Sequence, residues 1–128
     1  MADDIDVLRR GYEAFGRGDI EAIAEDFTDD VEFVGPDSRA ARDYKGKAAV
    51  AGLLAGMGER WDALAWEPEE FIREGGTVVV LGRMAGTARG TGTQVRIPFA
   101  HVWRVSGGKV RHGQAFTDTA AIGGALGG

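Results

Sequence analysis

The sequence has 128 residues, of which 44% are hydrophobic and 27% charged, with a net charge of −5 and no cysteine. These values are typical of one globular domain with its own core, so we expect residues 1–128 to form a single domain. The acidic balance disfavours nucleic acid as a partner, and the lack of cysteine excludes disulfides and thiolate chemistry. No apolar stretch is long enough for a membrane span and the acidic start is no secretory signal, so we expect a cytoplasmic protein.

The first half of the chain has the residue spacing of helices. Apolar residues recur every three or four positions over residues 4–18, which predicts an amphipathic helix, and a second, shorter helix is expected over residues 20–27. Residues 31–34 alternate like a strand, and residues 37–46 are expected to form an irregular loop. A third helix is predicted from Lys47 to about Trp61, weakened by three glycines.

From Trp66 onward the pattern changes to strands separated by glycine turns. The predicted strands cover residues 66–73, 77–87, 94–105 and 110–117, and the glycine-rich tail after them is expected to fray. Short turns between successive strands predict antiparallel hairpins. Helices followed by strands indicate an α+β fold, with the helices packed on one face of the sheet.

The last hairpin decides which side chains share a face. If Gly107-Gly108 is a two-residue turn, Trp103 faces His112 and His101 faces Gln114. One face is then mainly apolar with a few polar groups, as in a ligand pocket, and consists of Ile97, Phe99, His101, Trp103, Val105, His112, Gln114 and Phe116. The other face carries Arg96, Arg104 and Arg111. A bulge would slip the partner strand by one residue and turn Gln114 and Asp118 outward, so both registers stay open.

Six segments spread over nearly the whole chain carry a family resemblance, namely residues 12–15, 17–22, 27–33, 44–50, 98–103 and 108–110. In these segments the chain resembles the SnoaL-like polyketide cyclases, a ketosteroid isomerase-related group of the nuclear-transport-factor-2-like superfamily. The resemblance implies a barrel-like cone, in which a strongly bent, mostly antiparallel sheet packs on three N-terminal helices around a deep hydrophobic cavity. It also implies a homodimer formed through the open face of the sheet.

The superfamily includes isomerases, epoxide hydrolases, dehydratases, cyclases and pure binding modules, so the fold does not select an activity. Ketosteroid isomerases carry a carboxylate after the first strand and a tyrosine on the first helix, where this chain has Gly35 and Gly11, the latter one residue before Tyr12. The chain therefore departs from the isomerase pattern. SnoaL-type cyclases pair a polar group on the penultimate strand with an aspartate near the end of the last strand, positions that match His101 and Asp118.

We accordingly expect His101 and Asp118 to act as an acid/base pair. The alternatives are a core histidine for His101 and a helix cap for Asp118. The expected ligand-binding residues are Tyr12, Phe33, Trp61, Phe99, Trp103, Gln114 and Phe116, for most of which packing in an aromatic core is the alternative. No motif or spacing indicates a metal site.

The leading hypothesis is a cofactor-independent enzyme that performs isomerase, cyclase or dehydratase chemistry on a small apolar cyclic or aromatic substrate. Its rival is a non-catalytic module that binds a small apolar ligand or mediates dimerisation. A third possibility, a structural subunit of a larger complex, predicts a large exposed apolar patch on the outer face of the sheet.

Overall fold

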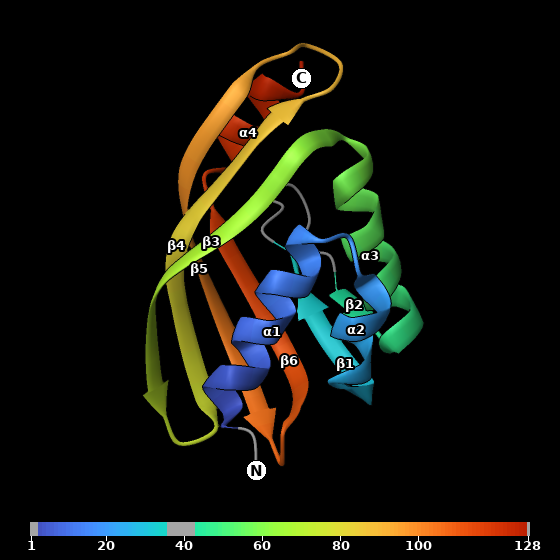
Figure 1. Ribbon diagram of the computed structural model, residues 1–128, viewed down its shortest axis with the longest axis vertical. Helices are drawn as coiled ribbons and strands as arrows, with labels where there is room; N and C mark the ends of the chain where they lie inside the picture. Colours follow the sequence, from blue (N-terminus) through green and yellow to red (C-terminus); the bar gives the residue numbers. More distant parts are fainter. Residues whose placement is uncertain (1–2, 36–42, 128) are drawn as a thin grey trace.

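The computed structural model describes residues 3–35 and 43–127, in which four helices pack around one six-stranded sheet (Figure 1). The helices are α1 (Asp4–Gly16), α2 (Ile20–Glu25), α3 (Lys47–Glu59) and α4 (Thr119–Ala125). The strands are β1 (Phe27–Val34), β2 (Asp43–Lys45), β3 (Trp61–Glu74), β4 (Thr77–Ala88), β5 (Gln94–Ser106) and β6 (Lys109–Thr117).

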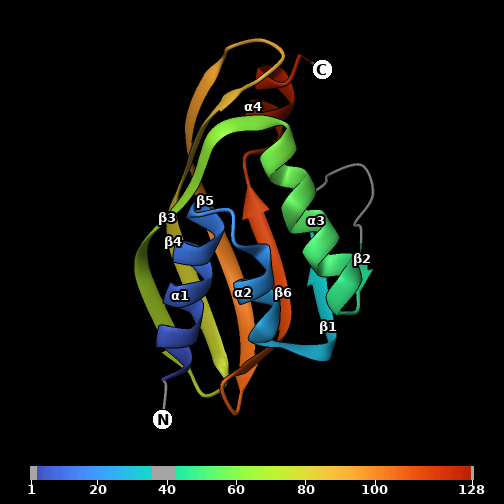
Figure 2. The ribbon, with the colours of Figure 1, turned by 45° about the vertical axis from the view of Figure 1, so that its right-hand side comes forward.

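The sheet is mixed and strongly bent, and its strand order is β2-β1-β6-β5-β4-β3. β1 runs parallel to β6, and the other four strand pairs are antiparallel. Helices α1, α2 and α3 cover its concave face, as Figure 2 shows. The predicted α+β fold is therefore confirmed, although the sheet does not close into a barrel.

Side-chain caps fix where the first two helices begin. The Asp3 carboxylate accepts a hydrogen bond from the Ile5 amide at 3.1 Å, and Asp19 accepts one from the Ala22 amide at 3.2 Å. Both caps satisfy amides that have no partner within the helix.

The expected loop over residues 37–46 is wrong at its end, because Asp43–Lys45 pairs with β1 as an edge strand. Residues 36–42 of that loop lie outside the described residues.

The chain end does not fray as expected, because it forms α4. This helix lies close to the β4–β5 connection (Figure 1), where the Thr91 hydroxyl donates to the Ala125 carbonyl at 2.5 Å. Ala125 is buried, and Ile122 and Leu126 pack against the core. Burial of these apolar side chains offsets the low helix propensity of the neighbouring glycines.

A bulge in β6 changes the register of the last hairpin. The Gly107-Gly108 turn and the Val105–Val110 pair form as predicted, and both glycines have positive φ. Arg111 is then an extra residue, so that Arg104 pairs with His112, and His101 pairs with Ala115 rather than Gln114. The prediction that His112, Gln114 and Phe116 share the His101 face is wrong, because a one-residue slip turns every later side chain to the opposite face.

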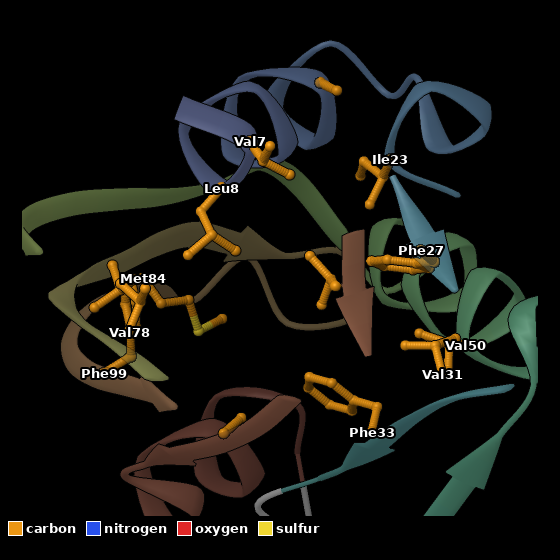
Figure 3. Packing of buried hydrophobic residues seen from close by; sticks show 14 of the residues in the cluster. Val7, Leu8, Ile23, Phe27, Val31, Phe33, Val50, Val78, Met84 and Phe99 are labelled. Atoms are coloured by element: carbon orange, nitrogen blue, oxygen red, sulfur yellow. The ribbon is translucent and has the colours of Figure 1, made fainter. Parts of the chain in front are cut away.

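The core lies between the three N-terminal helices and the concave face of the sheet. The side chains labelled in Figure 3 come from α1, α2, α3, β1, β4 and β5 and point into this shared interior. The labelled residues are Val7, Leu8, Ile23, Phe27, Val31, Phe33, Val50, Val78, Met84 and Phe99. No helix within residues 3–35 and 43–127 combines the length and the apolar character that a membrane crossing requires.

Candidate functional site

The buried imidazole of His101 is the centre of the candidate site. His101 lies on the concave face of β5 with 6% of its surface exposed, the one polar or charged residue among the fully buried side chains of the described chain. Four aromatic rings surround it. The distances from their centroids to the imidazole are 4.2 Å for Phe99, 5.1 Å for Trp66, 5.7 Å for Trp103 and 5.8 Å for Tyr12.

A short hydrogen-bonded chain joins α1 to β5 through this imidazole. The Tyr12 hydroxyl lies 2.7 Å from His101 Nδ1, and the indole Nε1 of Trp103 donates to the same hydroxyl at 2.9 Å. A neutral imidazole has one donor and one acceptor nitrogen. If the Tyr12 hydroxyl donates to Nδ1, Nε2 carries the proton and can donate to a ligand.

Burial sets the charge state of both groups in this chain. Removal from water lowers the pKa of His101 to about 3, so the imidazole is neutral at physiological pH. Burial also raises the pKa of the Tyr12 hydroxyl well above its usual value, and the Trp103 hydrogen bond offsets a smaller part of that rise. The site therefore offers neutral hydrogen-bonding groups, not a charged acid or base. Among the described residues, no group hydrogen-bonds to His101 Nε2.

Two pockets meet at His101. The smaller has a volume of about 70 Å³ and lies between α1, α2 and the sheet, with Tyr12 in its wall. The larger has a volume of about 220 Å³ and is walled by α3, α4 and strands β1 and β3–β6. Leu54, Trp66, His101 and Trp103 line both. An apolar cavity of about 150 Å³ can hold benzene, so the larger pocket has room for a ring system.

Gly113 makes room for the Trp103 side chain. These two residues are paired across β5 and β6, and a Cβ atom at position 113 would overlap the indole ring and lie 3.1 Å from the Phe33 ring. The bulge at Arg111 brings this glycine, and not His112, opposite Trp103. Ala115 and Thr117 follow it on the same face and line the larger pocket. Small residues on β6 thus leave the space that the aromatic residues of β5 enclose.

The structure brings together some of the predicted site residues. Tyr12, His101 and Trp103 form the hydrogen-bonded chain, and Phe33 and Trp61 line the larger pocket. Phe99 is buried directly against the His101 ring. In the described chain Tyr12 itself, one residue after Gly11, extends its hydroxyl to His101.

Gln114, Phe116 and Asp118 do not join this group. The first two lie on the outer face beside Val102 and Ala100, where 49% of Phe116 is exposed. Asp118 is exposed and caps α4, since its carboxylate accepts a hydrogen bond from the Ala121 amide at 3.0 Å. This is the capping alternative that the sequence left open.

Other residues around the site were not predicted from the sequence. Trp66 packs against two rings of β5, with its ring centroid 5.2 Å from that of Phe99 and 5.1 Å from that of His101. Leu54, Met57 and Arg60 come from α3 and its end. The available signal was the alternation of Leu64 and Trp66, which extends the predicted strand over residues 66–73 toward the N-terminus, where β3 begins at Trp61. No cluster of three or more potential metal ligands occurs among residues 3–35 and 43–127.

The comparison with family models identifies the fold. The SnoaL-like domain model matches residues 8–113, which is most of the chain. The chain belongs to the SnoaL-like family. No curated protein matches this SnoaL-like domain.

Solved structures similar to this SnoaL-like domain share its NTF2-like fold. An NTF2-like protein of unknown function from Burkholderia pseudomallei is 26% identical, with full coverage of both chains and a TM-score of 0.89. TerC, co-crystallised with polyporic acid, is 28% identical over 98% of each chain with a TM-score of 0.87. A putative SnoaL-like polyketide cyclase from Jannaschia is 21% identical over 96% of this chain and 90% of its own, with a TM-score of 0.86, and shows the fold alone.

Proposed function

We propose that this SnoaL-like domain binds a small, mainly apolar ring compound in the larger pocket, with one ligand oxygen hydrogen-bonded to His101 Nε2. The observation that carries the proposal is a buried imidazole whose Nδ1 has a partner and whose Nε2 has none among the described residues. A hydrogen bond from this N–H to a ligand oxygen would contribute about 0.5–1.5 kcal/mol to binding.

The walls of the pocket support a ring compound. All three tryptophans of the sequence, Trp61, Trp66 and Trp103, line it together with Phe33. Aromatic walls favour flat ligands through stacked and edge-to-face contacts. TerC, whose structure was determined with polyporic acid, supports the idea that this fold accepts an organic acid.

The test is titration with 2-naphthol, a two-ring probe with one hydroxyl, followed by NMR of the indole N–H signals. Because all three indoles line the pocket, we expect saturable shifts of each signal. Ala115→Leu fills the pocket and should abolish these shifts, whereas Ala120→Leu, at an exposed position of α4, should bind as the wild type does. The proposal fails if no saturable shift occurs, or if folded Ala115→Leu binds 2-naphthol unchanged.

A second candidate function is proton transfer on a carbonyl substrate, and the 2.7 Å contact between Tyr12 and His101 favours it. A neutral imidazole held in one tautomer can polarise a carbonyl by hydrogen bonding, as an electrophile rather than as a strong acid. A general base would then have to take the α-proton, and His101, with its low pKa, is a weak one. Asp118 would have to leave its cap on α4 to serve.

Exchange of the α-protons of 2-tetralone in D₂O, followed by NMR, tests this second function. The enzyme hypothesis predicts exchange above the buffer rate, slowed at least tenfold by His101→Gln. Asp118→Asn keeps a capping oxygen but removes the carboxylate base. Slow exchange in Asp118→Asn would therefore assign the base, whereas wild-type exchange at the buffer rate would contradict this function and leave the binding function standing.

A further inference from the structure

The charge in the lining of the larger pocket is of one sign only. Its lining contains one ionised side chain, Arg60, at the residue between α3 and β3, and no acidic residue. The other polar groups in the lining are the neutral His101, the Thr117 hydroxyl and the indole N–H groups. The Trp103 N–H and the Thr117 hydroxyl already donate to the Tyr12 hydroxyl and the Pro98 carbonyl. His101 Nε2 and the indole N–H groups of Trp61 and Trp66 can donate to a ligand.

Arg60 has no salt-bridge partner among the described residues. The neighbouring Arg89 does, because its Nε lies 2.8 Å from the Asp62 carboxylate. Asp26, the acidic residue in the wall of the smaller pocket, pairs with Arg10 at 3.5 Å and does not line the larger one. An arginine in the lining of a pocket with no carboxylate in its walls makes the electrostatic potential of that pocket positive.

Arg60 and His101 favour different chemical groups on a ligand. Arg60 is exposed, so its guanidinium stays hydrated where the pocket meets water, and His101 is buried. A ligand that satisfies both carries an anionic group at one end of an apolar ring body and an acceptor or hydroxyl oxygen at the other. An ammonium group would meet the positive charge of Arg60 and, among the polar side chains of the lining, only the Thr117 hydroxyl as an acceptor.

From this distribution we infer that the pocket selects organic anions, aromatic carboxylates in particular, and that Arg60 is the residue that determines this specificity. The inference rests on the proposed binding function and adds the chemical class of the ligand. Arg60 is then a binding residue at the pocket entrance, where a planar guanidinium can pair with both carboxylate oxygens.

The experiment compares two probes of one shape, 2-naphthoate and 2-naphthamide, in titrations followed by the indole N–H signals. Wild-type protein should bind 2-naphthoate about two- to fivefold more tightly, as expected for an ion pair near the surface. Arg60→Gln should remove that preference and leave 2-naphthamide binding unchanged, and Arg60→Lys should keep part of it. Raising the salt concentration from 50 to about 500 mM should weaken 2-naphthoate binding alone.

Arg111→Gln is the matched control, because it removes the same charge from an exposed position on β6 outside the pocket lining. It should retain the wild-type preference. Equal binding of the two probes to wild-type protein would overturn the anion inference while the binding function stands. The same holds if Arg60→Gln keeps the preference, or if Arg111→Gln loses it equally. Failure of both probes to bind would overturn the binding function as well.

Discussion

At the scale of single residues, the Tyr12 hydroxyl holds two other side chains in place. It accepts a hydrogen bond from the Trp103 indole N–H and bonds to His101 Nδ1. It comes from the middle of α1, whose start is held to β3 by the ion pairs of Arg73 with Asp3 and Asp4. Two buried polar groups therefore depend on one oxygen atom. The geometry of the His101 ring, and with it the direction of Nε2, depends on Tyr12.

We predict that Tyr12→Phe lowers the free energy of unfolding by about 1–3 kcal/mol, because it leaves two buried groups without a partner. The measurement is urea denaturation. Tyr44→Phe is the control, since Tyr44 is half-buried on the edge strand β2 and makes no side-chain hydrogen bond among the described residues; it should change stability by less than about 0.5 kcal/mol. Equal effects of the two substitutions would contradict the assigned role of Tyr12.

The low pKa of His101 predicts acid sensitivity. An unfolded histidine has a pKa of about 6.5, whereas the folded His101 has a pKa of about 3, so the unfolded state binds the proton first as the pH falls. The contribution of the neutral His101 to the free energy of unfolding is therefore fully present above about pH 6.5 and is lost as the pH falls toward 3. Between pH 6.5 and 5 the wild type should lose about 1.5 kcal/mol more than His101→Gln does.

Urea denaturation of both proteins at each pH measures this difference. His101→Gln retains every carboxylate and His112, so the contributions of those groups cancel in the comparison. Parallel pH dependence of the two proteins would show that His101 takes up its proton without unfolding.

At the scale of elements, glycines play opposite roles in α3 and in β6. Gly56, in the middle of α3, has no atom near the position that a Cβ would occupy, whereas a Cβ at Gly113 would overlap the Trp103 ring. Gly56→Ala should therefore stabilise the protein by about 0.5–1 kcal/mol, because alanine favours the helix. Gly113→Ala should destabilise it by about 1–3 kcal/mol through overpacking.

Thermal unfolding of the two variants beside the wild type checks this pair. Opposite shifts of the melting temperature are expected. A neutral Gly113→Ala would mean that the Trp103 ring moves aside without cost, in which case its indole signal should also shift.

The helices and strands themselves were largely predictable from residue spacing. Which side chains of β6 point to the concave face of the sheet was not. The periodicity of α1 and the glycine turns between strands mark where each element lies, because these signals are local. The bulge at Arg111 depends on seating Trp103 over Gly113, which involves residues on two strands and has no local signature. Hence His101, before the bulge, was placed correctly, and Gln114, after it, was not.

The same argument applies to the site. Aromatic residues that alternate on β5 were found from the sequence, and the link from Tyr12 to His101 spans 89 positions of the chain. The packing of α1 on the sheet determines that the Tyr12 hydroxyl reaches His101, and the sequence does not specify that packing locally. Arg60 follows the end of a helix, where neither periodicity nor a motif indicates a pocket wall.

At the scale of the whole molecule, the convex face of the sheet presents apolar side chains to solvent. Ile72, Leu81 and Phe116 are 47%, 37% and 49% exposed, and strand pairing places Leu81, Ala100 and Phe116 in one row across the sheet. Arg96 and Arg104 lie on the same face toward the two ends of β5 and bound this patch. An exposed apolar area with a charged rim is typical of a protein interface.

We propose that two copies of the chain associate through this face, as the family resemblance implied. Light scattering after size exclusion should then give the mass of a dimer for the wild type and of a monomer for Phe116→Lys. Gln94→Lys, at the exposed start of β5, adds the same charge away from the patch and should remain dimeric. A monomeric wild type would contradict the proposal, as would a Phe116→Lys protein that stays dimeric.

The extra residue in β6 also affects how this pocket could change in evolution. Deletion of Arg111 would restore the regular register, so that Gly113, Ala115 and Thr117 would leave the interior together and a more polar, bulkier set would replace them. A point substitution alters one lining residue at a time, whereas this single deletion would replace all the β6 side chains that line the pocket. Trp103 opposes the exchange, because His112 would then face a ring that now rests on a glycine. New specificities on this scaffold should thus arise by paired changes at the bulge and at position 103.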